Sequence, residues 1–347
     1  MATDDAPLRN LWYMAGLAAR VAAGQLQRQI LLGEPVLVGR GKDGKIFALR
    51  DICPHRGVPL SAGKLMADNA VECPYHGWRF RTDGVCSMIP SLVEGQDMDP
   101  AKIRVRAYPA REQDGLIWIY MAAEGQDSAT PASEPPKVPI ADAKPRWSMS
   151  QTFHCPIDHA VIGLMDPAHA PYVHGRWWWR VKPKVKSKAY GPLPTGFVMK
   201  RHQPTKPAYK MLGADVTTEI TFELPSTRFE IVAGTLLGKR VDVVGLTVCT
   251  PIDAETTQVT QIQYWPAWLG FIKPFFLLLG ETFLGDDRRM VELQKEGLKF
   301  NPNLMLIQDA DMPAIWYHRI KKAWAEHVET GAAFVNPVKD RVLRWRS

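Results

Sequence analysis

The sequence predicts an α+β protein with two domains: an N-terminal all-β domain, and a C-terminal domain in which helices cover an antiparallel β-sheet. The chain of 347 residues is longer than one hydrophobic core usually serves. Short runs of apolar alternation occur up to about Tyr120, and longer runs with helical stretches follow residue 145. A Pro-, Ser- and Ala-rich stretch separates them. We therefore expect domains at 1–123 and 146–347, joined by a connection at 124–145.

The expected elements follow in chain order. Short strands of the first domain are predicted at 30–40, 45–52, 70–80 and 104–121, with hairpin turns at Asp43-Gly44 and Asp83-Gly84. In the second domain, the long alternating stretches 209–238 and 241–265 are typical of a twisted antiparallel sheet. A helix is expected at about 281–298. The tail is expected to be helical again, with His318 and His327 on a solvated helix.

Composition narrows the class of protein. The hydrophobic content of 46% and the charged content of 23% are ordinary for a folded protein. The first thirty residues lack a basic start followed by an apolar run, so no secretory signal is expected. Five cysteines in so long a chain do not make a disulfide scaffold, which favours a reducing, cytoplasmic setting with cysteines as metal ligands. The net charge of +7 is accompanied by no nucleic-acid motif, so no nucleic-acid partner is expected.

One stretch has the spacing of a metal site. "CPHRGVPLSAGKLMADNAVECPYHGWRF", from Cys53 to Phe80, contains Cys-x-His, seventeen further residues, and then Cys-x-x-His. Mixed Cys and His ligands favour zinc, iron or copper. Zinc fingers pair Cys with Cys and His with His, whereas here each half carries one of each and could serve two metals. That is the requirement of a Rieske [2Fe–2S] centre. Intervening prolines and glycines predict two tight loops, whose backbone N–H groups could point at the bridging sulfides.

The two halves, "CPHRGVPLSAGKL" and "CPYHGWRF", resemble the Rieske motif of the bacterial Rieske non-haem iron oxygenases. The resemblance implies that Cys53 and Cys73 bind one iron and that His55 and His76 bind the other. It also makes residues 1–123 a Rieske domain, which would receive electrons that originate in NAD(P)H through a ferredoxin or a flavin reductase. Histidine ligation raises the potential of such a cluster above that of an all-cysteine cluster.

A second candidate metal site follows in "LMDPAHAPYVHGRWWW", which gives Asp166-x-x-His169-x4-His174. Two residues five apart lie about 140° apart around an ideal helix, so the histidines do not share a face unless the helix breaks. Pro171 is a suitable break, and it could swing His174 toward a metal held by His169. Non-haem Fe(II) oxygenases use two histidines and one carboxylate, with open positions for O₂ and substrate. Periodicity alone does not pick the carboxylate.

The family resemblance suggests the third ligand. In the family it lies on a C-terminal helix, often seven residues before a Gln, and "FLGDDRRMVELQ" places Asp287 seven before Gln294. Asp286 is the near alternative, because a shift of one residue rotates a side chain by about 100° around a helix. Either aspartate could instead cap a helix N-terminus. The weaker candidates, which read more simply as a turn before a proline, are Asp309 and Asp311.

The resemblance also assigns a role to Asp166. In the family, an Asp three before the first iron histidine bridges the two metal centres across subunits of a ring, commonly a trimer. Asp166 would then link His169 to His76 of the next chain; the alternative is a turn residue before Pro167. The sequence departs from the family upstream, where Ile162 and Gly163 replace an acidic residue and an Asn. This departure predicts a roomier and more apolar wall at the iron.

The sequence leaves two alternatives for the aromatic stretches and two for a lysine-rich strand. The aromatic stretches 176–180 ("RWWWR") and 264–285 are candidate pocket walls, or else core. Lys273 and Pro274 interrupt the second stretch, so a membrane span is not expected, although an interfacial helix stays an alternative. The lysines at 182, 184, 186 and 188 lie on one side of an extended strand. They suit a solvated edge that blocks strand pairing, or the steering of an acidic ferredoxin or an anionic substrate.

The sequence thus predicts a terminal oxygenase with a [2Fe–2S] cluster, a mononuclear Fe(II) and O₂ as co-substrate. By resemblance to the single-subunit members, it would hydroxylate, or O- or N-demethylate, an apolar ring-containing compound. The alternative reaction is aromatic cis-dihydroxylation. The alternative of a different class is a Rieske electron carrier with a binding module, against which the second His/His/Asp set argues.

Overall fold

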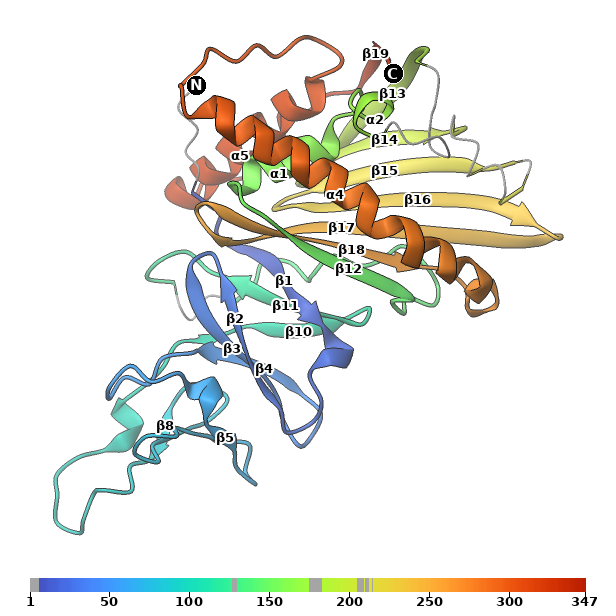
Figure 1. Cartoon of the computed structure of the whole chain (residues 1–347). Helices are drawn as coiled ribbons and strands as arrows, with labels where there is room; N and C mark the ends of the chain where they lie inside the picture. Colours follow the sequence, from blue (N-terminus) through green and yellow to red (C-terminus); the bar gives the residue numbers. More distant parts are fainter. Residues whose placement is uncertain (1–5, 127–129, 175–182, 205–208, 210–211, 214) are drawn as a thin grey trace. The chain divides into compact units, whose positions relative to one another are not determined.

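The computed structural model describes residues 6–126, 130–174, 183–204, 209, 212–213 and 215–347. The chain divides into one unit at Arg9–Lys137 and a second made of Met1–Leu8 and Val138–Ser347. The division between Lys137 and Val138 falls inside the predicted connection at 124–145. The predicted α+β class is confirmed, because strands alone build the sheets of the first unit and long helices join a large sheet in the second (Figure 1).

The unit Arg9–Lys137 contains three antiparallel sheets. The first has the order β1 (Leu11–Leu17), β11 (Leu116–Met121) and β10 (Ala110–Gln113). The second has the order β2 (Leu26–Leu31), β3 (Glu34–Arg40), β4 (Ile46–Arg50) and β9 (Ala107–Tyr108). The third has the order β5 (Lys64–Leu65), β6 (Val71–Glu72), β7 (Arg79–Phe80) and β8 (Cys86–Met88). Short 3₁₀ turns connect them at η1 (Ala18–Arg20), η2 (Leu60–Ala62) and η3 (Pro100–Lys102).

One core, shared by strands of the second and third sheets, includes the two motif cysteines. Cys53 and Cys73 belong to a buried cluster with strand residues such as Leu37, Leu49 and Phe80. Burial of these apolar side chains fixes the strands from which the two motif loops project, and so fixes the spacing between the loops.

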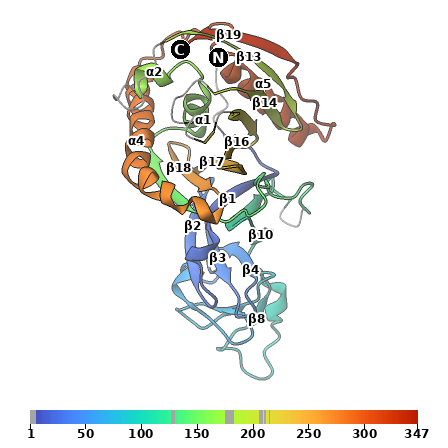
Figure 2. The ribbon, with the colours of Figure 1, turned by 90° about the vertical axis from the view of Figure 1, so that its right-hand side faces the viewer.

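The second unit is built on an eight-stranded antiparallel sheet. Its strand order is β12 (Trp147–Phe153), β18 (Thr256–Tyr264), β17 (Lys239–Asp253), β16 (Thr227–Leu236), β15 (Thr217–Glu223), β14 (Gly196–His202), β13 (Val185–Leu193) and β19 (Arg341–Arg346). The sheet curls around the helices in the view of Figure 2. Its helices are α1 (Ile157–Met165), α2 (Ala170–Val173), α4 (Lys273–Leu298) and α5 (Met312–Thr330), with a 3₁₀ turn at η4 (Ala267–Ile272).

Helices cover one face of this sheet. At one end Trp147 of β12 packs against Phe276 of α4, with ring centroids 5.6 Å apart. At the other end Tyr190 of β13 packs against Trp316 of α5, with centroids 5.5 Å apart. The strand register joins Trp147 and Tyr190 in one cross-strand row, so both point to the same face. Residues of that row therefore point toward the helices, and so do the residues two positions before or after them on each strand.

Three expectations for this unit need correction. The helix expected at 281–298 begins eight residues earlier, at Lys273, because Pro274 suits the first turn of a helix. Helix α5 is not simply solvated, since one face, including Trp316 and Ile320, is buried. The last residues form strand β19, which pairs with β13, so β13 is not a sheet edge. Long-range pairing of this kind has no local signal in the sequence.

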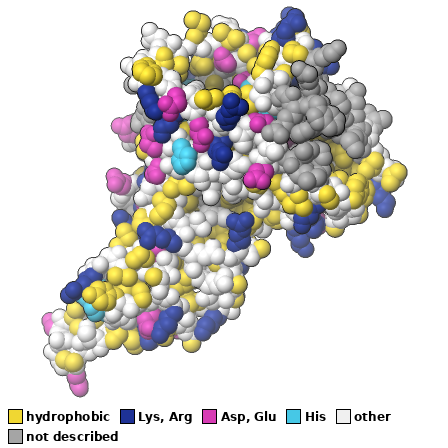
Figure 3. All heavy atoms as spheres, in the orientation of Figure 1, with side chains coloured by type: hydrophobic (Ala, Val, Ile, Leu, Met, Phe, Trp, Pro, Cys, Tyr) yellow, Lys and Arg dark blue, Asp and Glu magenta, His cyan; other side chains and the backbone are white. Residues whose placement is uncertain are grey.

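The surface carries mixed charge. On the face drawn in Figure 3, basic and acidic side chains are interspersed. Among the described residues, no helix combines the length and the apolar character needed to cross a bilayer.

Candidate functional site

The two motif loops of the unit Arg9–Lys137 are the same turn built twice. The N–H of Cys53 donates to the carbonyl of Val58 at 2.9 Å, and the N–H of Gly57 donates to the carbonyl of Cys53 at 2.8 Å. In the second loop the matching bonds run from Cys73 to Trp78 at 2.8 Å and from Gly77 to Cys73 at 3.1 Å. Both glycines have left-handed φ angles, 74° and 71°. Only glycine adopts these angles without strain, which explains the repeated spacing.

The loops bring the four predicted cluster ligands together at the loop tips. Cys53 and Cys73 are almost fully buried, at 2% and 3% exposure. The imidazoles of His55 and His76 lie side by side at the surface, with ring centroids 4.5 Å apart. Trp78 stacks on His55 at 4.7 Å with an interplanar angle of 5°, which holds that ring in place. A cysteine pair and a histidine pair are the two ligand sets that the two irons of a Rieske cluster use.

Burial and the backbone N–H groups of the first loop act on the pKa of the Cys53 thiol in opposite directions. Burial raises the pKa of the Cys53 thiol to about 11, and the nearby Cys73 thiol adds to the rise, whereas backbone N–H groups of His55 and Arg56 lower it. Those N–H groups would stabilise sulfur charge once a metal is bound. Beside Cys53, the buried Asp51 accepts bonds from Ser61 N at 2.7 Å and Ser61 Oγ at 2.6 Å, which fixes the first loop. These residues fit a [2Fe–2S] cluster.

The second candidate centre lies where α1 ends. Asp166 is the C-cap of α1, because Pro167 cannot continue the helix, and its Oδ1 accepts a bond from Ala168 N at 2.6 Å. His169 and His174 flank the four-residue helix α2 at its two ends. Pro171 therefore lies in the first turn of α2 instead of breaking a helix, which corrects the predicted position of the break. The break at Pro167 and the shortness of α2 turn both imidazoles to one point.

Three ligand atoms converge at that point. His169 Nε2 and His174 Nε2 are 3.3 Å apart. Asp287 Oδ1 lies 3.5 Å from the first and 3.2 Å from the second. Ligand atoms about 2.1 Å from one metal ion are about 3.0 Å apart at right angles and about 3.4 Å apart at tetrahedral angles. The observed triangle fits one ion. In the described part of the chain, it is the only group of three such ligand atoms that lie within 4.8 Å of one another.

The outward nitrogens of both histidines face carboxylates. His169 Nδ1 is 3.8 Å from Asp166 Oδ2, and His174 Nδ1 is 3.7 Å from Asp286 Oδ2. Both Nδ1 atoms are buried and make no hydrogen bond with the described residues. Burial raises the pKa of the Asp166 carboxyl, and burial lowers the pKa of His169. A neutral imidazole with a carboxylate behind it is the usual state of a metal-bound histidine.

The structure distinguishes the alternative roles predicted for Asp286, Asp287, Asp309 and Asp311. Asp286 and Asp287 lie in the middle of α4, so neither caps a helix. Asp287 points at the histidine Nε2 atoms, whereas Asp286 lies behind His174. Asp309 instead pairs with Arg341 at 3.0 Å, and Asp311 accepts a bond from Ile307 N at 2.8 Å.

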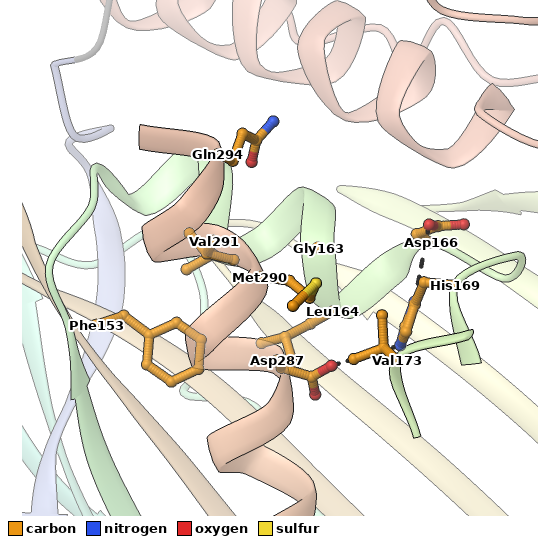
Figure 4. Close-up of a pocket in the computed structure, with 11 residues that line it drawn as sticks. Phe153, Gly163, Leu164, Asp166, His169, Val173, Asp287, Met290, Val291 and Gln294 are labelled. Atoms are coloured by element: carbon orange, nitrogen blue, oxygen red, sulfur yellow. Dashed lines mark ion pairs between the residues drawn. The ribbon is translucent and has the colours of Figure 1, made fainter. Parts of the chain in front are cut away.

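A cavity of about 220 Å³ opens next to the triangle, between α1, α2 and α4 (Figure 4). Its walls are mainly apolar, with one amide from Gln294. Gly163 lines it, and a Cβ there would come within 3.3 Å of Val291 Cγ2, so the glycine allows α1 and α4 to approach closely at this wall. The remaining apolar lining residues are Phe153, Ala160, Leu164, Val173, Met290 and Val291.

Of the two stretches that were candidate pocket walls or core, only 264–285 falls within the described residues. The residues 176–180 ("RWWWR") lie outside the described residues. Of 264–285, Trp265 and Phe276 belong to a core cluster against β12, not to the cavity. Phe283 is the exception at the site, since it stacks on His174 with centroids 3.7 Å apart. The sequence analysis did not predict that Met290, Val291 and Gln294 line the cavity. They lie about one and two helical turns beyond Asp287, so the helical period could have indicated that they share its side of the helix.

Comparison with known families matches both units. The Rieske [2Fe-2S] domain matches residues 11–109, and the Vanillate O-demethylase oxygenase C-terminal domain matches residues 153–327, half of the chain. The chain belongs to the Rieske non-haem iron oxygenases. The chain contains both halves of the Rieske motif and the His/His/Asp triangle.

Relatives of this chain include bacterial and chloroplastic proteins. It is 36% identical over 172 residues to the oxygenase component of dicamba O-demethylase from Stenotrophomonas maltophilia, which covers 48% of each chain. It is 34% identical over 174 residues to the toluene-4-sulfonate monooxygenase system iron-sulfur subunit TsaM1 from Comamonas testosteroni, covering 48% of this chain and 46% of the relative. A chlorophyllide a oxygenase from Chlamydomonas reinhardtii is 36% identical over 171 residues, 24% of its length. The matches thus span less than half of these relatives.

Solved structures agree in fold. Dicamba monooxygenase bound to dicamba superposes with a TM-score of 0.72 at 23% identity, covering 94% of this chain and all of that one. The Pseudomonas putida CBB5 NdmA QL mutant with caffeine gives a TM-score of 0.71 at 21% identity, covering 92% of each chain. Both likenesses concern the fold.

Proposed function

We propose that this chain is a terminal monooxygenase that hydroxylates, or O- or N-demethylates, an apolar ring-containing substrate. The observation that carries the proposal is the convergence of His169, His174 and Asp287 on one point in a chain that also folds two Rieske loops. A Rieske domain alone would suit an electron carrier. A second, three-ligand site with an adjoining apolar cavity is what O₂ chemistry on an organic compound requires.

Each residue set has its own task in this proposal. Cys53, His55, Cys73 and His76 hold the [2Fe–2S] cluster, which would accept single electrons from a ferredoxin or a flavin reductase served by NAD(P)H. The triangle holds Fe(II), which supplies O₂ activation when bound and leaves positions open for O₂. Asp166 and Asp286 orient the two histidines from behind. The apolar walls of the cavity exclude bulk water and hold the ring beside the iron.

The relatives support monooxygenation over cis-dihydroxylation. One relative is named as an O-demethylase and another as a monooxygenase. The family resemblance further suggests a homotrimer in which Asp166 links His169 to the cluster of a neighbouring subunit. The five cysteines are all free and buried, which supports a reducing, cytoplasmic location.

Metal analysis and product analysis test this function. The oxygenase should contain about three irons and two sulfides per chain, whereas a carrier with a binding module should contain about two irons. With reductase, NADH and a panel of methoxyarenes and N-methyl heterocycles, we expect oxygen-dependent formation of formaldehyde and the demethylated product. A cis-diol product would establish dihydroxylation instead, and the lack of oxygen-dependent product with three irons bound would contradict monooxygenation of this substrate class.

A further inference from the structure

Two residues of the iron site lie on one short loop. Asp166 ends α1 and His169 precedes α2, so only Pro167 and Ala168 lie between them. Asp166 Oδ1 accepts a bond from Ala168 N at 2.6 Å, which closes a turn within the loop. This bond fixes the shape of the loop but not its position relative to α4, the helix that carries Asp287. A contact from outside the loop can set that position.

The carbonyl of Pro167 makes such a contact, because it accepts two hydrogen bonds from the end of the chain that includes β19. Trp345 Nε1 and Ser347 Oγ each donate to it at 3.1 Å. Proline has no N–H, so the carbonyl is the only backbone group by which this residue can be held. Trp345 is 8% exposed and Ser347 is 0% exposed, so water competes little for the two bonds. Figure 1 shows this end of the chain beside α2.

The bonds at Ser347 fix the direction of its hydroxyl proton. A serine hydroxyl has one proton to donate and can accept two hydrogen bonds. Lys186 Nζ donates to Ser347 Oγ at 2.7 Å, and Trp345 Nε1 donates to it at 2.9 Å. Because both acceptor positions are occupied, the proton points to the Pro167 carbonyl. The charged Lys186 donor also polarises the hydroxyl, which strengthens the bond that the hydroxyl donates.

Strand β19 is a firm support for the loop. It pairs with β13 along its whole length, and β13 pairs with β14 on its other side. Just beyond β19, Ser347 N donates to the carbonyl of Lys184 and Lys184 N donates to the carbonyl of Ser347, both at 3.2 Å. Arg341 of β19 also pairs with Asp309, in the turn before α5, at 3.0 Å. The two donors to Pro167 are therefore fixed to the sheet.

The iron triangle is sensitive to small shifts of the loop. His169 Nε2 lies 3.5 Å from Asp287 Oδ1, and His169 Nδ1 lies 3.8 Å from Asp166 Oδ2, so the ring is held between the two carboxylates (Figure 4). Side chains of a functional site must stay within about 0.5 Å of their productive positions. A shift at Pro167, two residues before His169, would move the ligand together with the carboxylate behind it.

We propose that Trp345 and Ser347 are positioning residues of the iron site. Through their bonds to the Pro167 carbonyl, they hold the loop that carries Asp166 and His169 in place against Asp287. The sheet, and not only the packing of α1 and α2 on α4, thereby sets the geometry of the triangle. This inference rests on the iron site of the proposed function and does not depend on the substrate.

The iron affinity of the folded protein tests the two bonds. Trp345→Phe removes one donor and keeps an aromatic ring, and Ser347→Ala removes the other donor. Because either donor alone can hold the carbonyl, each single variant should lower the apparent Fe(II) affinity only about two- to tenfold, as the loss of one hydrogen bond implies. The double variant should lower it about tenfold or more, and by more than the product of the single effects. Chelator competition on protein that retains its cluster, well below the melting temperature of each variant, measures this affinity.

Trp316→Phe is the matched control. Trp316 is another buried tryptophan of this unit, at 4% exposure, and it packs on Tyr190 of β13. This change should lower the melting temperature as the other variants do, but it should leave the Fe(II) affinity of the folded protein unchanged. The cluster absorption should be the same in every variant, because the predicted cluster ligands lie in the other unit.

Two results would overturn the positioning role. One is a double variant with wild-type Fe(II) affinity. The other is an equal loss of affinity in Trp316→Phe, which would show that any loosening of the unit releases iron. The proposed function fails on a different measurement: a wild-type protein that binds only the two irons of the cluster would contradict both proposals. A wild-type protein with three irons, whose affinity does not depend on Trp345 and Ser347, would contradict the positioning role alone.

Discussion

The Nδ1 of His174 lies 3.7 Å from the Oδ2 of Asp286, on the opposite side of the ring from the Nε2 that faces Asp287. Asp286 and Asp287, which are neighbours on α4, therefore each face a different nitrogen of the His174 imidazole. His169 repeats the arrangement, with Asp166 behind it and Asp287 in front. A carboxylate behind a ligating histidine fixes its tautomer and raises its basicity.

Asp286→Asn should weaken iron binding without abolishing it. The loss of the charge behind His174 should reduce the apparent Fe(II) affinity about 10–100-fold, the usual effect of such partners. Chelator competition on protein that retains its cluster measures this affinity. Glu292→Gln, which changes a half-buried acid on the same helix that pairs with Arg288, is the matched control. An Asp286→Asn protein with wild-type affinity would show that the 3.7 Å approach has no energetic role.

Asp287→Ala should remove the mononuclear iron and leave the cluster intact. Two histidines alone then remain of the three converging ligands. Metal analysis should show the loss of about one iron per chain, with unchanged visible absorption. The assignment of the two aspartates would be reversed if Asp286→Ala, and not Asp287→Ala, gave the iron-free protein.

Asp166→Asn should keep both metals but slow electron transfer between them. The substitution is nearly isosteric, and an amide oxygen can still accept the bond from Ala168 N. The amide lacks the charge that a carboxylate presents to imidazole N–H groups. In a single turnover from prereduced cluster, with substrate and O₂, cluster reoxidation should slow by orders of magnitude. Reoxidation at the wild-type rate would reduce Asp166 to a turn residue.

Cys73→Ser should abolish the visible absorption of the cluster and all turnover, because serine does not replace a soft thiolate ligand. Cys86→Ser provides the control, since Cys86 is buried in the same core cluster but has no predicted role as a ligand. It should keep the cluster spectrum, with some loss of stability. A normal spectrum in Cys73→Ser would remove Cys73 from the ligand set.

Asp158→Ala should destabilise the catalytic unit. The buried carboxylate of Asp158 on α1 accepts from Lys321 Nζ and Tyr317 Oη of α5, both at 2.7 Å. Removal of the carboxylate leaves a buried ammonium without this partner, which typically costs about 3–5 kcal/mol. Tyr317→Phe should cost only about 1 kcal/mol. Urea unfolding of the two variants measures the difference, and equal effects would contradict the importance of the buried charge.

The sequence determined the parts of this protein that depend on local spacing. The predicted cluster ligands Cys53, His55, Cys73 and His76 could be picked from the sequence because each half of the motif closes its own turn, with a glycine at a fixed place. The α+β class could also be predicted, because apolar alternation and helical periodicity show within short stretches of sequence. The meeting of His169 and His174 was predicted only on the condition that a proline breaks the helix, and the structure places that break at Pro167.

Tertiary structure decided whatever depends on segments distant in sequence. The roles of Asp286 and Asp287 differ by one position on α4, and only the packing of α4 against α1 and α2 directs one to the metal point and the other behind His174. The same packing, not the aromatic run 264–285, places Met290 and Val291 in the cavity wall. The pairing of β19 with β13 turns a predicted edge into an interior strand. Such contacts arise from burial of surfaces over the whole chain, and no local window of the sequence records them.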